Sequence, residues 1–187
     1  GTDQIGGDFY VEEPDRSCGI RVRPAGSGQV SEGESVEVVG KLDTLPSGER
    51  AIVDATVRRA PLPIPGPTAL GMPNRSVGRG DFFYEPGPPG VGQVGVVGGL
   101  GLNNIGLLVR TWGRVKSADP MSGSFVIDDG SNVDLKCVAP AQVLLPSPGQ
   151  YVSVTGISSC EAGDPGPVRV ICVRRQADIV AVPEGDG

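Results

Sequence analysis

The chain contains no histidine among its 187 residues. Histidine is the usual general base of hydrolases and the commonest metal ligand in proteins, so Ser-His-Asp and Cys-His catalysis are both excluded. No other catalytic residue set stands out in the sequence. We therefore expect a protein that is not an enzyme and that uses no cofactor and no metal ion.

Positive charge and aromatic residues are also scarce. Lys and Arg number 16 against 22 Asp and Glu, the net charge is −6, and Phe, Trp and Tyr make up 4% of the chain. Affinity for nucleic acids comes largely from basic side chains and from aromatic stacking, so a nucleic-acid partner is disfavoured. The basic pairs Arg58-Arg59 and Arg174-Arg175 are more typical of solvated strand ends. No run of about 20 apolar residues predicts a membrane span.

Cysteines are few, and no CxxC pair indicates a zinc site. Cys160 and Cys172 flank the turn at 162–167 almost symmetrically, so a hairpin would bring them within reach of a disulfide. Cys18 and Cys137 then remain to pair with each other, with another chain, or not at all, and Cys137 to Cys172 is an alternative bridge. A disulfide favours an extracellular or cell-surface location.

What the chain has in abundance is glycine and proline, 30 and 18 residues respectively. Between them lie short valine-rich runs, V-E-V-V at 36–39, V-S-V-T at 152–155 and V-R-V-I-C-V at 168–173. Such runs, bounded by Gly, Pro, Ser and Asp, are typical of short strands and tight turns. No segment convincingly predicts a helix, so we expect an all-β protein.

One stretch of the sequence recurs 116 residues later. Residues 7–13 align with 123–129, and 123 minus 7 is 116. The same offset places Gly33, Val36, Val38 and Gly40 on Gly149, Val152, Val154 and Gly156. Each copy then closes with a β-branched run, at 51–57 and at 168–173. The repeat is therefore a whole structural unit.

The second copy begins with a strand that the first copy lacks. Residues 107–117, LLVRTWGRVKS, alternate between two faces, and we expect Trp112 to pack in the core. Subtracting 116 places the counterpart at positions before residue 2. The first copy thus has four strands where the second has at least five.

Both copies resemble oligonucleotide/oligosaccharide-binding (OB) domains of secreted bacterial proteins. The resemblance rests on GDFYVEEPDRSCGIRV at 7–22 and GSFVIDDGSNVDLKCVA at 123–139, each followed by a G-x-x-V-x-V-x-G segment. It covers about two thirds of the chain and implies five-stranded Greek-key barrels that bind single-stranded nucleic acid, sugar or protein. We expect an incomplete OB-like barrel at 1–60 and a complete one at 107–187.

The connecting segment at 61–106 is rich in Gly and Pro but too apolar for a solvated linker. Two alternatives stay open: it folds back over the two barrels, or it docks on a neighbouring subunit. The residues that would form this assembly surface are Phe82, Phe83, Tyr84, Val94, Val96, Val97 and Leu100. The segment also contains a glycosylation sequon at Asn74, so a glycan there is a further candidate partner.

A barrel without its first strand exposes two backbone edges, which proteins do not leave bare. The missing strand comes from an upstream segment, from residues 94–100, or from another subunit. The last source produces head-to-tail polymers. We therefore predict a non-enzymatic extracellular subunit that assembles with itself into a filament or surface layer. The alternative is a secreted OB-fold module that binds single-stranded nucleic acid or oligosaccharide, with a ligand face that contains Tyr10, the aromatic residues 82–84, Arg58, Arg59, Arg174 and Arg175.

Overall fold

The computed structural model describes residues 7–26, 30–60, 65–87 and 90–183. Within these ranges the regular elements are strands and two single-turn 3-10 helices, so the prediction of an all-β protein is confirmed. None of the helices described there is long and apolar enough to cross a membrane.

The strands fall into two main groups along the chain, with a middle segment of short strands between them. The first half contains β1 (Phe9–Glu12), β2 (Gly19–Pro24), β3 (Val36–Thr44) and β4 (Arg50–Arg59). The middle contains β5 (Leu70–Gly71), η1 (Asn74–Ser76), β6 (Phe82–Glu85) and β7 (Val91–Gln93). The second half contains β8 (Leu108–Asp119), β9 (Ser124–Asp128), β10 (Leu135–Val138), β11 (Tyr151–Glu161), β12 (Val168–Cys172), η2 (Gln176–Asp178) and β13 (Ile179–Ala181).

Strands of the second half close into a ring. β8 pairs with β9, β9 with β10, β10 with β12, β12 with β11, and β11 again with β8. Every pair is antiparallel except β10 and β12, which are parallel. We call these five strands the closed ring. Its interior is apolar because every second residue of each strand points inward, and Phe125, Ile127 and Val154 are almost fully buried there.

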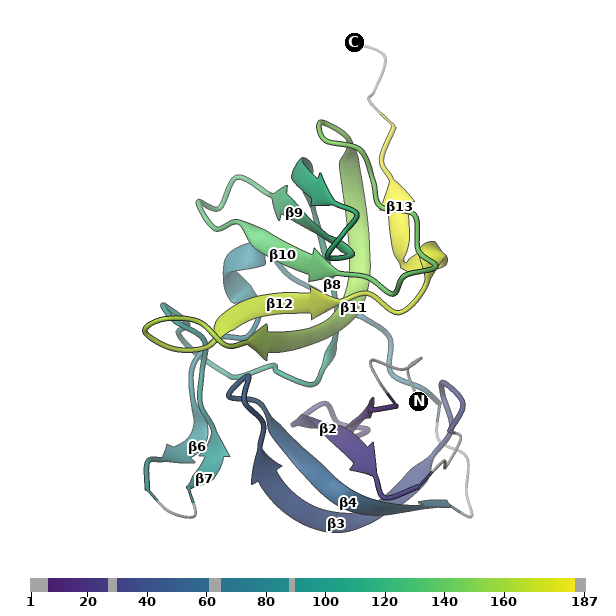
Figure 1. Cartoon of the computed structure of the whole chain (residues 1–187), viewed down its shortest axis with the longest axis vertical. Helices are drawn as coiled ribbons and strands as arrows, with labels where there is room; N and C mark the ends of the chain where they lie inside the picture. Colours follow the sequence, from purple (N-terminus) through teal and green to yellow (C-terminus); the bar gives the residue numbers. More distant parts are fainter. Residues whose placement is uncertain (1–6, 27–29, 61–64, 88–89, 184–187) are drawn as a thin grey trace.

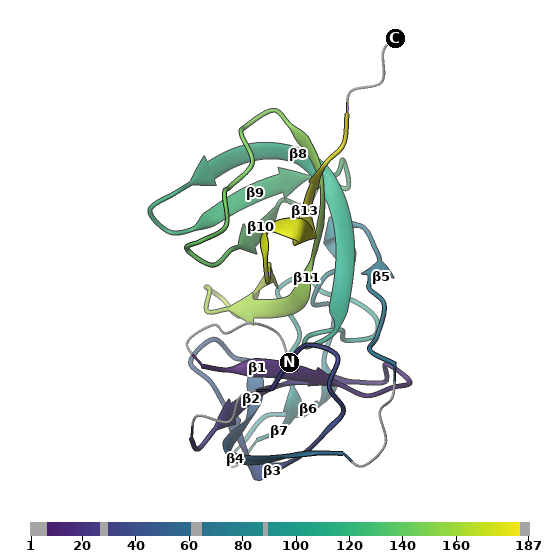
Figure 2. The same cartoon turned by 90° about the vertical axis from the view of Figure 1, so that its right-hand side faces the viewer.

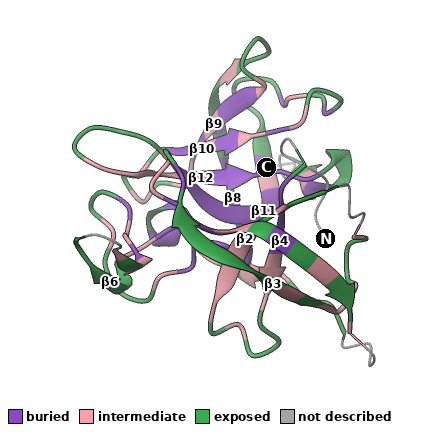
Figure 3. Ribbon diagram, turned by 60° about the horizontal axis from the view of Figure 1, so that its bottom comes forward, coloured by how far each residue is buried: buried purple, intermediate pink, exposed green. Residues whose placement is uncertain are grey.

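The four strands of the first half form a sheet in the order β1-β2-β4-β3. Again the pairs are antiparallel, except β2 and β4, which are parallel. We call this the open sheet. Its core is smaller than that of the ring, with Phe9, Val22 and Ala55 as its buried members. In Figure 3 the ring strands are largely buried, whereas much of β3 is exposed.

Among the described residues, the open sheet repeats the ring strand by strand, except for β8. Subtracting 116 from β9, β10, β11 and β12 gives residues 8–12, 19–22, 35–45 and 52–56, which overlap β1, β2, β3 and β4 respectively. The glycines match as well. A Cβ on Gly156 would lie 2.5 Å from the Cys172 carbonyl oxygen, and one on Gly40 would lie 2.6 Å from that of Val53. Both glycines therefore permit the same close approach of two strands.

The open sheet lies directly below the closed ring in Figure 1. Figure 2 shows β1 next to the ring and β3 farthest from it. Gly19 and Gly106 meet at the contact, and a Cβ on Gly19 would lie 2.3 Å from the Gly106 carbonyl oxygen. Beside them, the Tyr10 hydroxyl contacts Glu49 Oε2 at 3.1 Å and Ser159 Oγ at 3.2 Å. Because all three side chains are buried, this polar cluster links the two units.

The middle segment packs mainly on the closed ring. β5 runs parallel to β8, with Leu70 opposite Val109. Val96 is buried with Ile105 and Cys160, and the Val97 N–H donates to the Pro167 carbonyl. β6 and β7 form a separate hairpin that projects from the body (Figure 1). The segment therefore folds back over its own chain and leaves one hairpin exposed.

None of the predicted disulfides is present, and all four cysteines are free. In the β11–β12 hairpin Cys160 lies opposite Arg169, and Cys172 lies opposite Ile157. The pairing register thus separates the two sulfurs by three positions along the strands, although the turn looked symmetrical in the sequence. Cys137 is buried in the core of the closed ring, and Cys18 lies in the turn between β1 and β2.

Candidate functional site

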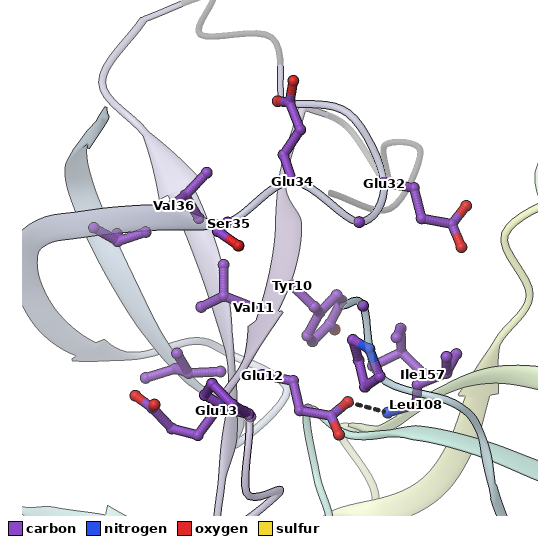
Figure 4. Close-up of a pocket in the computed structure, with 18 of the residues that line it drawn as sticks. Tyr10, Val11, Glu12, Glu13, Glu32, Glu34, Ser35, Val36, Leu108 and Ile157 are labelled. Carbon is purple, nitrogen blue, oxygen red and sulfur yellow. Dashed lines mark hydrogen bonds between the residues drawn. The ribbon is translucent and has the colours of Figure 1, made fainter. Parts of the chain in front are cut away.

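A groove of about 450 Å³ lies beside the open sheet, between β1 and β3. Volumes of this size are typical of ligand sites. Figure 4 shows side chains of β1, of the loop before β3 and of the closed ring around it. The lining residues on the first unit include Tyr10, Val11, Glu12, Glu13, Cys18, Ile20, Glu32, Glu34, Val36, Val38 and Ile52. Gly106, Leu108, Ile157 and Arg174 provide the wall on the side of the ring.

The groove occupies the place that β8 takes in the closed ring. β8 lies between β9 and β11 and pairs with both. Their counterparts β1 and β3 each have one strand partner among the described residues, β2 and β4 respectively. The strand edges that β8 covers in the ring are therefore the two edges that border the groove.

The floor of the groove is apolar and partly open. Val11, Val36 and Val38 are half-buried. At the same positions in the ring, Ile127, Val152 and Val154 are between 0% and 1% exposed. The difference arises because β8 covers those residues in the ring, whereas no described strand covers the floor of the groove. Burying this apolar surface would stabilise a complex with an incoming strand.

The rim of the groove carries four carboxylates. Glu32 accepts hydrogen bonds from Arg174 and Arg175, and Glu34 lies 2.9 Å from Arg59. Glu13 has no ion-pair partner in the part of the chain that the structure describes. With Arg16 beside Glu12, four arginines lie close to the carboxylates of this rim.

Glu12 occupies the most unusual position on this rim. Its Oε2 accepts a hydrogen bond from the Leu108 N–H at 2.9 Å (Figure 4). Its Oε1 is buried without a hydrogen-bond partner among the described residues, and Arg16 Nε lies 3.8 Å away. Burial raises the pKa of this carboxyl, and the Leu108 N–H and Arg16 oppose the shift. A donor brought into the groove would satisfy this oxygen.

The described lining of the groove includes one thiol. The nucleophile in the groove is Cys18, and burial together with Glu13 raises the pKa of its thiol. A raised pKa lowers the thiolate fraction and with it the reactivity. No three metal-ligating side chains converge within residues 7–26, 30–60, 65–87 and 90–183.

Residues of the alternative ligand face do not form one surface. Tyr10 is buried in the polar cluster between the two units. Arg174 is buried with Asp178 and Glu32, and Arg175 also binds Glu32. The structure brings Arg59, Arg174 and Arg175 to the loop before β3, and all three contact acidic side chains there, whereas Arg58 lies opposite Glu37 within β3.

The residues of the predicted assembly surface separate into two groups. Phe82, Phe83, Tyr84, Val97 and Leu100 are exposed, and Phe83 has a positive φ of 46°. Val94 is half-buried and Val96 is buried, so these two contribute to packing within the chain. The run 94–100 contacts the ring at Pro167 and does not enter the groove.

Asn74 lies in the interior of the protein, which rules out the predicted glycan in this fold. It is 0% exposed. Its side-chain amide donates to the carbonyls of Ile127 and Val133, and its Oδ1 accepts from the Thr111 hydroxyl. The asparagine of the sequon therefore has a structural role, because its hydrogen bonds connect η1 to the ring.

The sequence interpretation placed Trp112 on the wrong side of its strand. Trp112 is 52% exposed and lies on the outer face of β8 between Arg110 and Arg114, with Tyr151 across from Arg114. The opposite face, with Val109, is the buried one. The charges on either side of Trp112 were the signal that could have identified its face as the outer one.

Neither protein-family models nor curated protein sequences match this chain.

Proposed function

We propose that the protein is a non-enzymatic, extracellular structural subunit that assembles with itself head to tail into a filament or surface layer. A neighbouring subunit fills the groove with a strand and so completes the open sheet. The single observation that carries the proposal is the strand-by-strand match of the open sheet to the closed ring, with no counterpart of β8 among the described residues. Sheet edges and half-buried valines of this kind favour strand addition.

The proposal includes the interpretation of both units as OB-like barrels, the first without its first strand. In the ring, β10 runs parallel to β12, which are the third and fifth strands of that unit. In the open sheet, β2 runs parallel to β4, which are the third and fifth strands when the missing first strand is counted. This shared pairing order supports the interpretation. In this interpretation β8 is the first strand of the second barrel.

The exposed hairpin of β6 and β7 provides a second contact between subunits. Phe82, Phe83 and Tyr84 lie on it, and Phe83 is 82% exposed. Exposed aromatic side chains on a projecting element are typical of interaction surfaces. A contact between different surfaces of successive subunits produces an open polymer, except where the rotation from one subunit to the next closes a ring.

Negative-stain electron microscopy at several protein concentrations, with sedimentation velocity, tests this proposal. We expect regular fibres or sheets that grow with concentration. The variant Val38→Asp places a charge on the groove floor and should abolish assembly. The control Val39→Asp changes the neighbouring residue, which is 73% exposed, and should assemble like the wild type. Monodisperse particles at every concentration would contradict the proposal.

The Trp112 surface favours a second candidate function, that of a binding module for single-stranded nucleic acid or oligosaccharide. Exposed Trp112 and Tyr151 beside Arg110 and Arg114 form a stacking surface with positive charge. Trp112 is the only tryptophan, so its fluorescence reports binding directly. Quenching by an oligonucleotide or oligosaccharide that is lost in Trp112→Ala would support this function, and an unchanged signal would dismiss it.

A further inference from the structure

One wall of the groove belongs to the segment that follows β4. Residues 65–67 are part of the lining. A Cβ on Gly66 would lie 3.4 Å from the Gly33 Cα, in the loop before β3. Next in the chain, the Thr68 hydroxyl oxygen accepts a hydrogen bond of 2.6 Å from Arg16 Nη2, in the turn after β1. The segment therefore runs from the β3 side of the groove to its β1 side and bounds the groove between them.

The interior of the groove is apolar on the side of the ring as well as on its floor. Tyr10, Leu108 and Ile157 belong to one buried cluster, and Ala69 of the same wall segment packs against it. The groove volume of about 450 Å³ is roughly three times the ~150 Å³ that accommodates benzene in an apolar protein cavity. A compact ring system therefore fits between these walls.

The charges on the rim of the groove balance one another. The four carboxylates of the rim lie close to four arginines of the described chain, so the rim has no net formal charge. Moving an ion from water into an apolar space costs free energy unless an opposite charge pairs with it. Because the rim offers no surplus of either sign, the groove favours a neutral molecule over an ion.

One buried acceptor in the groove lacks a donor. The Glu12 side chain is 6% exposed, and its Oε2 accepts the hydrogen bond from the Leu108 N–H (Figure 4). Its Oε1 has no hydrogen-bond partner among the described residues. Arg16 Nε is 3.8 Å from Oε1, which is beyond hydrogen-bond distance, and the same guanidinium donates to Thr68. A ligand N–H or O–H supplies the missing donor after a small rotation about the terminal torsion of Glu12, which is soft in glutamate.

We propose that the groove is a binding site for a small neutral molecule that has an apolar ring system and one N–H or O–H donor, and that this donor hydrogen-bonds to Glu12. The apolar walls select the ring system, the balanced rim selects a neutral molecule, and the unpaired carboxylate oxygen selects the donor. This inference goes beyond the proposed function and does not rest on it. The ligand would compete with an incoming strand, because both occupy the same groove.

Indole is the probe, and benzofuran is its matched control. The two molecules have the same shape and nearly the same size, but benzofuran has an oxygen atom in place of the indole N–H. Equilibrium dialysis against the full chain measures the binding of each. We expect saturable binding of indole and about tenfold weaker binding of benzofuran, because benzofuran cannot donate a hydrogen bond to the buried carboxylate.

The variant Glu12→Gln tests the role of the carboxylate. The glutamine carbonyl oxygen keeps the hydrogen bond from the Leu108 N–H, which turns the amide NH₂ toward the groove. This variant should bind indole about tenfold more weakly and lose the preference for indole over benzofuran. Glu13→Gln changes the neighbouring, exposed carboxylate and should bind both molecules like the wild type. Circular dichroism shows whether each variant is folded.

The wild type provides a second readout that does not depend on any variant. Cys18 lines the groove, so saturating indole should slow its reaction with iodoacetamide several-fold. Equal binding of indole and benzofuran, or an unchanged reaction rate of Cys18, overturns the inference even if the protein forms filaments. Indole binding by a protein that stays monodisperse supports the inference and contradicts self-assembly. Slower filament growth in the presence of indole supports both.

Discussion

At the residue scale, the most informative group is the polar cluster of Tyr10, Glu49 and Ser159 between the open sheet and the closed ring. Glu49 Oε2 accepts hydrogen bonds from Tyr10, Ser159 and Arg21 at 3.1, 3.1 and 3.3 Å. Buried polar groups of this kind specify one arrangement of two units, because any other arrangement leaves them unpaired.

Tyr10→Phe should lower the free energy of unfolding by about 1 to 2 kcal/mol, because the variant removes a buried hydroxyl that contacts two polar groups. Urea unfolding followed by circular dichroism measures the change. Tyr84→Phe on the exposed hairpin is the matched control and should change stability by less than about 0.5 kcal/mol. Equal effects of the two variants would show that the cluster does not hold the two units together.

The cysteines provide a second prediction at this scale. Burial, with smaller charge effects, raises the pKa of both Cys160 and Cys172 to about 12, and burial also raises that of Cys137. At pH 8 a thiol reagent should therefore modify Cys18 first and the other three only after unfolding. Cys18→Ser should remove the early reaction. Fewer than four reactive thiols in the unfolded, unreduced protein would reveal a disulfide and restore the interpretation made from the sequence.

At the scale of elements, the matching glycines Gly156 and Gly40 lie on strands with different pairing. Gly156 lies on a strand that is paired along both edges, and Gly40 lies on a strand that is paired along one edge. β11 lies between β8 and β12, whereas β3 pairs with β4 alone among the described strands. The constraint on a new side chain at each glycine should therefore differ, although the local contacts are nearly the same.

Gly156→Ala should destabilise the protein by about 1 to 3 kcal/mol, because strands on both edges of β11 prevent it from moving away. Gly40→Ala should cost less, since β3 is free to shift at the groove. Thermal unfolding of both variants and of Gly71→Ala checks this, because a Cβ on Gly71 meets nothing within 4 Å. A larger effect at Gly40 would mean that β3 is held on its groove side as well.

The elements also show how far sequence patterns predict a fold. Alternating valines and turn residues were sufficient for the strand assignments, since both are local properties. They did not decide which face of β8 is buried or which residues are opposite one another in the β11–β12 hairpin. Both depend on the pairing register, because a slip of one residue exchanges the faces of a strand.

At the scale of the whole molecule, Glu49 couples the contact between the two units to pH. Burial raises the pKa of Glu49 above its ordinary value of 4.5, and Arg21 opposes the shift. A carboxyl with a raised folded-state pKa contributes stability that is complete below the unfolded-state pKa. That stability is lost as pH rises through the folded-state pKa. Acidic conditions should therefore favour the contact between the open sheet and the ring.

The wild type should lose stability relative to Glu49→Gln as the pH rises above about 4.5, because the glutamine stays neutral. Urea unfolding of both proteins at several pH values between 4 and 8 measures the difference. Effects of other buried carboxyls, such as Glu12, occur in both proteins and cancel. A difference that stays constant with pH would show that Glu49 does not titrate differently on folding.

The sequence by itself determined the all-β fold and the repeat at 116 residues. Each of these follows from local patterns and from spacing along the chain. Only the tertiary structure decided that the cysteines stay free, that Asn74 is buried and that residues 94–100 pack on the ring. These outcomes depend on contacts between distant segments. The groove depends on both sequence and tertiary structure. The repeat in the sequence predicts its position, and the packing of β1, β3 and the ring gives it a charged rim.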